Sequence, residues 1–268
     1  MAAAPNTDSY RWSFFVAVGM TPRMTNEILV SVVLGTCLAG FVQGLSGFAF
    51  GLVAMSVWSW SIEPQLAAPM VVFGSIVGQL LGIGVVRRSF EARRAMPFIL
   101  GGMFGVPLGV LLLRYVDLRL FRGGVGLFLI GYCSVMLLAR HLPVVTRGGP
   151  LLDSVIGWIG GVMGGLGGLT GPAPTLWCTL RGWDRDAQRA VFQSFNLTMQ
   201  ILTFAAYAVS GTLTLGMTRI FAVMVPAAIL PTLAGLRLYR RVSTSGFQRL
   251  VLVLLLISGV LLVVSLRH

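Results

Sequence analysis

Three amide side chains in the C-terminal half have a spacing that suits ligand binding. Gln193, Asn196 and Gln200 occupy positions i, i+3 and i+7 of an otherwise apolar segment. That spacing puts them on one face of a helix, and a side-chain amide both donates and accepts hydrogen bonds. A polar face in a membrane-spanning segment lies towards the protein interior. We therefore expect an uncharged polar site there.

Two glycine-rich stretches could complete such a site. The second runs from Gly157 to Pro174, and a similar stretch with fewer glycines begins at Gly40, 121 positions before Gly161. Both are apolar but carry too many glycines for an ordinary spanning helix, so we expect each to break. A helix that restarts at the middle of the membrane directs free N–H groups and the positive end of its dipole towards that middle. Pro172 suits the first position of the second such helix, where no donor is needed.

The predicted anion-binding residues are these glycine-stretch positions together with nearby neutral polar side chains. The first half supplies Gln43, Ser46, Gly47, Phe48, Ser75 and Gln79. The second half supplies Gly167, Gly168, Leu169, Thr170, Gly171, Gln193, Asn196 and Gln200. The free N–H groups would belong to Ser46, Gly47 and Phe48 in the first stretch, and to Gly168, Leu169, Thr170 and Gly171 in the second.

Simpler interpretations exist for the same residues. Glycine pairs four positions apart, such as Gly40/Gly44 and Gly161/Gly165, let helices pack closely. A single glutamine such as Gln43 or Gln79 is often an interhelical hydrogen bond. A cluster of glycines that breaks a helix occurs twice, each time near amide side chains, and this repetition favours a ligand site.

Composition indicates a polytopic membrane protein. Of 268 residues, 56% are hydrophobic and only 10% charged, whereas about a quarter are charged in soluble domains. All 20 basic residues are arginine, and they sit between apolar runs rather than on one nucleic-acid-binding face. Without lysine the chain has neither a Walker phosphate loop nor a Schiff-base lysine. The three cysteines lack metal-ligand spacing, and we expect no metal and no cofactor.

The apolar runs define the expected spans, since a crossing needs about 20 apolar residues. Six ordinary spans are Leu66–Val86, Ala95–Leu113, Gly123–Ala139, Ala190–Ser210, Ile220–Leu236 and Leu250–Leu266. None of these six contains Asp or Glu, which argues against a cation pump and favours an anion site. Two longer regions, Ile28–Ser61 and Ser154–Leu180, contain the glycine stretches and must break.

The arginines decide how the two long regions run. If each is a hairpin that returns to its starting side, 13 arginines face one side and 7 the other. If each crosses once, the division is 10 against 10. The positive-inside rule favours hairpins, with both termini on the arginine-poor, outer side.

Each half is then a hairpin plus three crossings, so the second half is inverted relative to the first. At an offset of 121, Gln79 meets Gln200, Ser75 meets Asn196 and Glu63 meets Asp184; at 124, Pro107 meets Pro231 and Tyr115 meets Tyr239. Glu63 and Asp184 are expected to cap the helices that follow them, with gating as the alternative. The predicted fold is all-α, with two inverted repeats at 27–142 and 153–268, a linker at 143–152 and an interfacial segment at 1–26. Inverted repeats with broken helices are a common build of secondary transporters.

One enzyme class matches a short motif. Gly44-Leu45-Ser46-Gly47 has the Gly-x-Ser-Gly form of rhomboid intramembrane proteases. Such a serine needs a base within hydrogen-bond reach, and the two histidines, His141 and His268, lie at segment ends. We therefore expect no enzymatic activity.

The two glycine motifs resemble those of the sulfite exporter TauE/SafE family. Gly40-Phe41-Val42-Gln43-Gly44-Leu45-Ser46-Gly47-Phe48-Ala49 opens the first half, and Gly160 to Pro172 opens the second. The resemblance runs from about Glu27 to the C-terminus and implies a multi-pass permease of the bacterial inner membrane. It implies sulfite, a sulfonate or a related small anion as substrate. Ser46 stands where the richer motif often has glycine.

Three hypotheses remain for the function: a secondary transporter that works by alternating access, a passive anion channel, and a non-transporting assembly subunit. The partners expected are the small anion, the bilayer and, for a transporter, a coupling proton or ion; nucleic acid is not expected. The anion, the direction of transport and the oligomeric state, a homodimer included, stay open.

Overall fold

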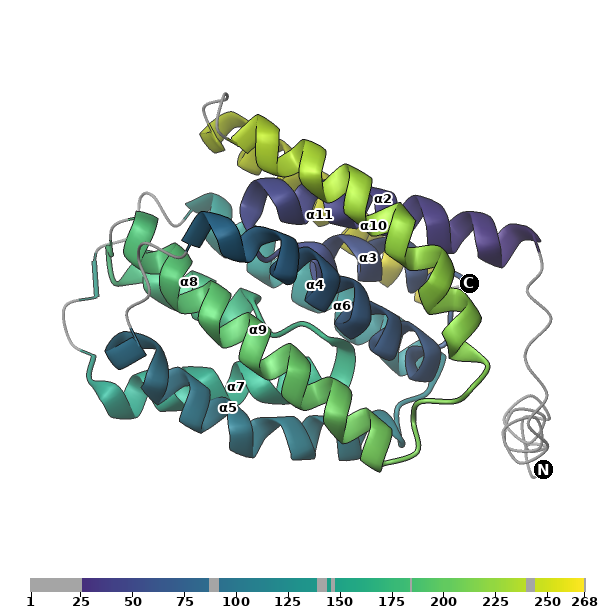
Figure 1. Ribbon diagram of the computed structural model, residues 1–268, viewed down its shortest axis with the longest axis horizontal. Helices are drawn as coiled ribbons and strands as arrows, with labels where there is room; N and C mark the ends of the chain where they lie inside the picture. The colour runs from purple at the N-terminus through teal and green to yellow at the C-terminus, as the bar shows by residue number, and fades with distance from the viewer. Residues whose placement is uncertain are drawn as a thin grey trace.

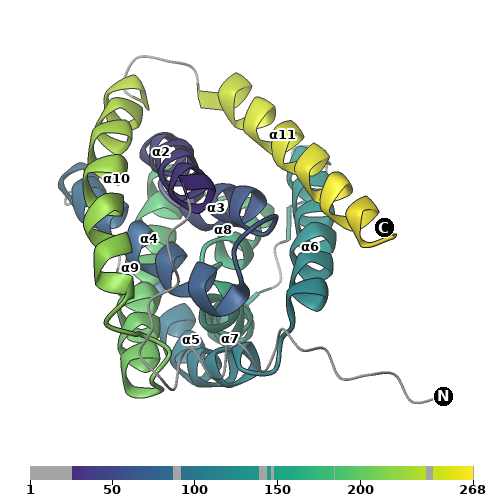
Figure 2. The same cartoon turned by 90° about the vertical axis from the view of Figure 1, so that its right-hand side faces the viewer.

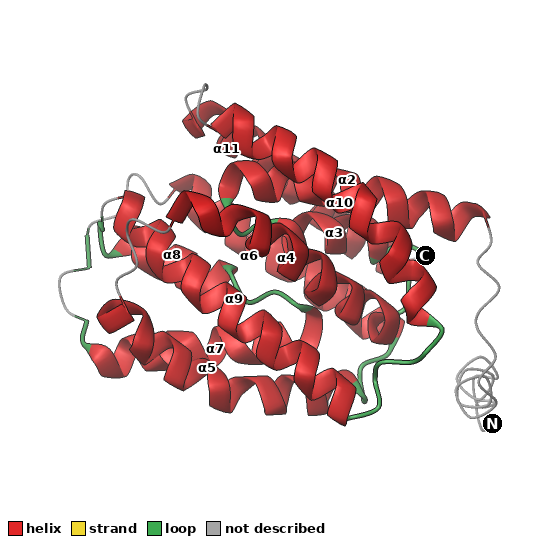
Figure 3. Ribbon diagram, viewed as in Figure 1, coloured by secondary structure: helices red, strands yellow, loops and turns green. Residues whose placement is uncertain are grey.

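The computed structural model describes residues 26–86, 92–138, 144–145, 148–183, 185–239 and 244–267, and the regular structure in these residues is helical (Figures 1 and 3). The first half contains α2 (Asn26–Ser46), α3 (Phe50–Trp58), α4 (Pro64–Val86), α5 (Ala92–Leu113) and α6 (Leu118–Leu138). The second contains α7 (Pro150–Gly167), α8 (Pro172–Leu180), α9 (Arg185–Val209), α10 (Met217–Tyr239) and α11 (Thr244–Val264), followed by a 3₁₀ turn at Ser265–Arg267. The predicted interfacial segment, apart from Asn26, and Asp184 lie outside the described residues.

The six ordinary spans are single helices, α4, α5, α6, α9, α10 and α11, as predicted. Within the described residues, five helices are long and apolar enough to cross a membrane: Glu27–Ser46, Pro64–Gly82, Arg93–Leu113, Leu118–Leu138 and Met217–Tyr239. In α11 a shorter apolar stretch covers Arg249–Val264. The 25 residues of α9 are long enough to cross, but its interior face is polar, so it is less apolar than the others.

Both long regions form hairpins, which confirms that prediction. Trp58, the last residue of α3, donates from Nε1 to the carbonyl of Ser31 near the start of α2, at 3.0 Å. Trp177 in α8 donates in the same way to Asp153 Oδ1 in the first turn of α7, at 2.7 Å. Each short helix therefore runs back along its long partner. About 22 Å of helix separates Ser31 from the break after Ser46 at 1.5 Å per residue.

Different arginines make contacts at the two ends of the bundle. At one end, Arg114 Nη2 donates to the carbonyl of Ser210 (2.8 Å), and Arg122 Nε donates to that of Ser59 (2.7 Å). At the other end, the Arg94 guanidinium lies 5.4 Å from the centre of the Trp183 ring. These contacts agree with the division of arginines between two sides. The start of α2 and the end of α11 lie at the same end of the bundle (Figure 1).

The halves pack on each other through glycine. A Cβ on Gly44 of α2 would collide with the Thr232 carbonyl of α10, and one on Gly165 of α7 with the Val106 carbonyl of α5. The glycine pairs therefore do serve close packing. These matching contacts relate α5 to α10 by 126 positions. The predicted offset of 124, which paired Pro107 with Pro231, differs from this relation by two residues, so these two prolines do not occupy equivalent positions in the packing.

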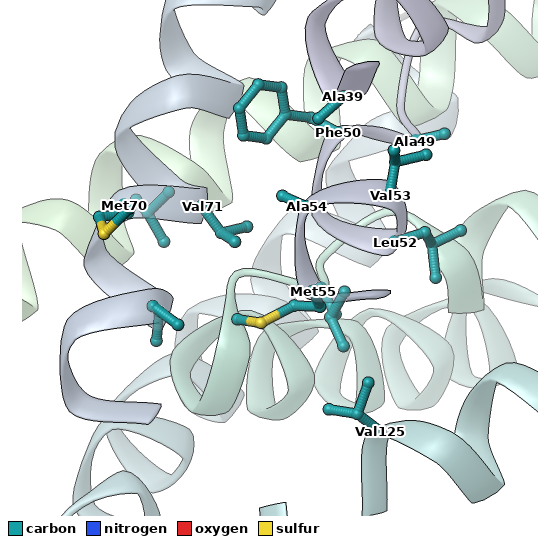
Figure 4. Close-up of a cluster of buried hydrophobic side chains, with 14 of the residues drawn as sticks. Ala39, Ala49, Phe50, Leu52, Val53, Ala54, Met55, Met70, Val71 and Val125 are labelled. Carbon is teal, nitrogen blue, oxygen red and sulfur yellow. The ribbon is translucent and has the colours of Figure 1, made fainter. Parts of the chain in front are cut away.

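The short helices lie inside the bundle. In Figure 2 the long helices surround α3 and α8. Phe50, Ala54 and Met55 of α3 are fully buried, and in Figure 4 the α3 side chains lie among Val71 of α4 and Val125 of α6. Burying apolar area of this kind stabilises the hairpin by about 25 cal/mol per Å² where water rather than lipid is the reference. The breaks are thus fixed in the interior rather than exposed to lipid.

Candidate functional site

Each hairpin breaks at a glycine with a left-handed backbone. Gly47 has φ of 87° and Gly168 has φ of 69°. Glycine populates this region without the steric penalty that a Cβ brings, and it is the usual residue just past a helix end. Helix α2 ends at Ser46 and α7 at Gly167, so in both hairpins the left-handed glycine follows directly after the helix.

At the first break, the N–H groups of Gly47, Phe48 and Ala49 are all hydrogen-bonded within the turn itself. The N–H of Gly47 donates to the Gln43 carbonyl at 2.7 Å. The N–H groups of Phe48 and Ala49 donate to Ser46 Oγ at 3.4 and 3.2 Å. The prediction that Ser46, Gly47 and Phe48 offer free N–H groups at a helix start is therefore wrong. Helix α2 continues through Ser46, whose hydroxyl then closes the turn before α3.

The second break keeps some donors free. The N–H groups of Gly168 and Leu169 donate to the carbonyls of Gly164 (2.7 Å) and Met163 (3.2 Å), so the prediction was wrong for these two as well. The N–H groups of Thr170 and Gly171 have no hydrogen-bond partner within the part of the chain that the structure describes. Gly171 immediately precedes α8. These two donors therefore stand at the positive end of a buried helix.

A chain of hydrogen bonds from α9 holds the second break. Gln200 Nε2 donates to the Gly168 carbonyl at 2.9 Å and to Thr170 Oγ1 at 3.1 Å. Thr170 Oγ1 in turn donates to Asn196 Oδ1 at 2.9 Å. This leaves Asn196 Nδ2 buried, with no hydrogen-bond partner among the described residues. Asn196 as a whole is only 2% exposed.

The free Asn196 donor points to the start of α8. A Cβ placed on Gly171 would lie 3.1 Å from Asn196 Nδ2 and 3.1 Å from Phe48 Cδ2. One on Gly51 would lie 3.0 Å from the Gly168 carbonyl. The two breaks therefore meet, and Phe48, whose ring centre is 5.5 Å from that of Phe192, supplies an apolar wall.

The first break has a related polar network. Gln79 Nε2 donates to the Gly47 carbonyl at 3.0 Å, as Gln200 does to Gly168, 121 positions later. Gln43 Nε2 donates to the Ser75 carbonyl at 3.0 Å. Gln79 and Gln200 thus hold the breaks in place. Ser46 Oγ, the serine of the rhomboid-like motif, is occupied as a hydrogen-bond acceptor in the turn.

The predicted residues therefore fall into groups. Direct contacts bring Phe48 together with Gly168, Thr170, Gly171, Asn196 and Gln200 around the second break, and the side chain of Leu169 lies beside Gly51. Gln43, Ser46, Gly47, Ser75 and Gln79 form the first-break network. Gln193 is buried beside Gly82 of α4, and no hydrogen bond joins it to either group. Gly167 is the buried last residue of α7.

Sequence reasoning missed the continuation of the polar face on α9. Thr203 and Tyr207 are both fully buried, and the Tyr207 hydroxyl donates to the Gly165 carbonyl at 2.7 Å. Their positions extend the spacing of Gln193, Asn196 and Gln200 in alternating steps of three and four residues. That spacing is the signal that could have found them. Tyr207 ties α9 to α7 one turn before the second break.

Comparison with known proteins identifies the family. The family model described as sulfite exporter TauE/SafE matches residues 32–262, which include most of the first hairpin and all of the second. No curated protein and no solved structure matches the chain. The match agrees with the resemblance of the two glycine motifs. The chain belongs to the sulfite exporter TauE/SafE family, whose members are multi-pass membrane transporters.

Proposed function

We propose that this protein is a secondary transporter of a small anion, with sulfite, a sulfonate or a related sulfur-containing or organic anion as substrate. The supporting observation is the set of unused donors at the second break. Asn196 Nδ2 is buried without a partner among the described residues and lies beside Gly171, and the N–H groups of Thr170 and Gly171 have no partner among them either. An unsatisfied buried donor costs about 1–3 kcal/mol, and a bound oxyanion would remove that cost.

The physics of the site favours an anion over a cation. Helix α8 has nine residues, and its N-terminus carries a partial positive charge that attracts negative groups. The polar side chains around Gly171 are neutral, and among the described residues no carboxylate is hydrogen-bonded to them. Backbone and amide donors can thus hold an anion without a formal charge in the membrane interior. A small anion would be bound tightly enough to be selected, yet weakly enough to leave.

The mechanism we infer is alternating access between the two sides. The break lies inside the bundle, flanked by α4 and α9, and the matching contacts of the two halves suit an exchange of packing between them. We place the arginine-rich end in the cytoplasm, because positive residues favour the cytoplasmic side, and we place the protein in the bacterial inner membrane on the basis of its family. A coupling proton or ion would drive accumulation.

Purified protein in liposomes tests this proposal. With sulfite on one side and an imposed proton gradient, we expect the liposomes to accumulate sulfite above the external concentration, and Asn196→Ala to transport much more slowly. Equilibration that never exceeds the external concentration would identify a channel instead. No movement of sulfite, sulfonates or carboxylates by folded wild-type protein would contradict transport and leave an assembly role.

A further inference from the structure

The hydrogen bonds around Thr170 determine which atoms of two amide side chains remain free. The Gly168 carbonyl can only accept, so the Gln200 atom 2.9 Å from it is the nitrogen. That nitrogen also donates to Thr170 Oγ1, whose own proton then goes to Asn196 Oδ1. The free atoms are therefore an acceptor, Gln200 Oε1, and a donor, Asn196 Nδ2. Both are buried with no partner among the described residues.

The free acceptor and the free donor are neighbours on one face of α9. Asn196 and Gln200 are one turn apart, and both amides contact Thr170 Oγ1. A second acceptor of fixed orientation is Gln43 Oε1, because Gln43 Nε2 donates to the Ser75 carbonyl. It too is buried without a partner in the described part of the chain. The polar interior thus offers unused carbonyl oxygens as well as unused N–H groups.

A fully deprotonated oxyanion satisfies only half of this arrangement. Its oxygens can accept from Asn196 and from the Thr170 and Gly171 N–H groups, but it has nothing to donate to Gln200. Leaving a buried acceptor unmatched, with anionic oxygens close to it, opposes binding. A monoanion that keeps one O–H group satisfies both: its negative oxygens face Asn196, and its O–H donates to Gln200 Oε1.

We propose that the substrate is bound as a monoanion that carries its own O–H donor, and that Gln200 Oε1 accepts that hydrogen bond. A monoprotonated oxyanion and a hydroxyalkyl sulfonate share this chemistry. The inference rests on the proposed function, because it assumes an anion at Asn196. For a protonatable anion it also means that a proton can cross the membrane on the substrate, without a carboxylate relay at the centre.

Two sulfonates that differ only in the donor test this inference. We would measure binding of 2-hydroxyethanesulfonate and propane-1-sulfonate to the purified full chain by calorimetry. They have the same charge and the same number of heavy atoms, with a hydroxyl in one replaced by a methyl in the other. We expect the hydroxyl compound to bind at least about tenfold more tightly, because its partner is a buried acceptor. Equal binding, or tighter binding of propane-1-sulfonate, would overturn the inference and leave the anion site intact.

Sulfite provides the second arm, for the case that the site excludes both sulfonates. Binding of total sulfite is measured on either side of the pH at which hydrogen sulfite loses its proton. We expect affinity to fall as pH rises, in proportion to the loss of hydrogen sulfite. Affinity that is constant or rises with pH would overturn the inference. Failure of folded protein to bind any of the three anions, or a small carboxylate, would instead contradict the proposed function.

A pair of matched variants assigns the acceptor. Gln200→Met and Gln79→Met each remove a hydrogen bond to a glycine carbonyl at a break, Gly168 in one and Gly47 in the other. We expect Gln200→Met to reduce the preference for the hydroxyl compound to about twofold or less, and Gln79→Met to keep it. A preference retained by both variants would overturn the role of Gln200. If Gln200→Met does not fold, the wild-type ligand pair still decides whether the donor is required.

Discussion

The two breaks share one scaffold but differ in what they leave unused. Both turn at a left-handed glycine, and both are held by a glutamine 32 positions later that donates to the carbonyl of that glycine. At the first break, Ser46 Oγ accepts the N–H groups of the turn. The position equivalent to Ser46, 121 residues later, is Gly167, which has no side chain to do so. Ser46 Oγ therefore pairs the Ala49 N–H, whereas the N–H of Thr170, the equivalent residue of the second break, has no partner among the described residues.

The equivalent residues of α4 and α9 also differ in the polar groups that they leave without a partner. Asn196 is equivalent to Ser75, and it presents a buried Nδ2 that no described residue accepts. The Ser75 carbonyl, by contrast, receives a hydrogen bond from Gln43 of the first hairpin. We infer that the first break serves mainly as support and as an apolar wall, through Phe48. We propose that the second break binds the anion.

The largest effect is expected at the turn of the second break. Gly168→Ala should strongly destabilise the protein, because a left-handed backbone costs a non-glycine residue about 1–2 kcal/mol. In addition, its Cβ would lie 2.5 Å from Val71 Cγ1, and overpacking costs typically about 1–3 kcal/mol. Thermal unfolding of the purified protein measures the change. Gly211→Ala is the matched control, since Gly211 has φ of 74° but open space around it. Equal destabilisation by the two would contradict tight packing at the second break.

Binding should distinguish the two breaks most clearly at equivalent positions. Asn196→Ala removes a donor to the anion, and hydrogen bonds to charged groups contribute about 1.5–3 kcal/mol, so we expect sulfite affinity to fall by about tenfold or more. Ser75→Ala should change it by less than about threefold. Calorimetry on the two variants, with unfolding temperatures as the folding control, makes the comparison. Equal losses would show that both breaks contact the ligand.

The glutamines that hold the breaks should affect stability unequally. Gln200→Ala removes hydrogen bonds to the Gly168 carbonyl and to Thr170, whereas Gln79→Ala removes one to the Gly47 carbonyl. An unsatisfied buried group costs about 1–3 kcal/mol, so both should lower the unfolding temperature, and Gln200→Ala should lower it more. The measurement is thermal unfolding without ligand. A greater loss for Gln79→Ala would reverse the ranking of the two networks.

The smallest effect is expected at the closed turn. Ser46→Ala removes the acceptor of the Phe48 and Ala49 N–H groups, and loss of such a cap costs about 0.5–2 kcal/mol. We expect a small decrease in unfolding temperature and unchanged sulfite affinity. A clear fall in affinity with little loss of stability would place Ser46 in contact with the ligand after all.

Much of the fold follows from the sequence, because span length, glycine clustering and arginine placement are strong constraints in a membrane. They predicted six single helices and two hairpins. They could not predict which N–H groups stay free at the breaks. That outcome depends on Ser46 Oγ folding back on its own turn, and on Gln200 and Asn196 reaching Thr170 from another helix. Likewise, the 126-position relation of α5 to α10 depends on helix packing that repeated proline and tyrosine residues do not reveal.

The most direct test is the position of a heavy-atom anion in the protein. Crystals grown with selenite, the selenium analogue of sulfite, would locate the ligand by anomalous scattering. We expect a selenium peak whose oxygens lie within hydrogen-bond distance of Asn196 Nδ2 and of the Thr170 and Gly171 N–H groups. A peak at the first break beside Ser46 and Gln43, or an empty centre in protein that still transports selenite, would contradict the claim that the second break binds the anion.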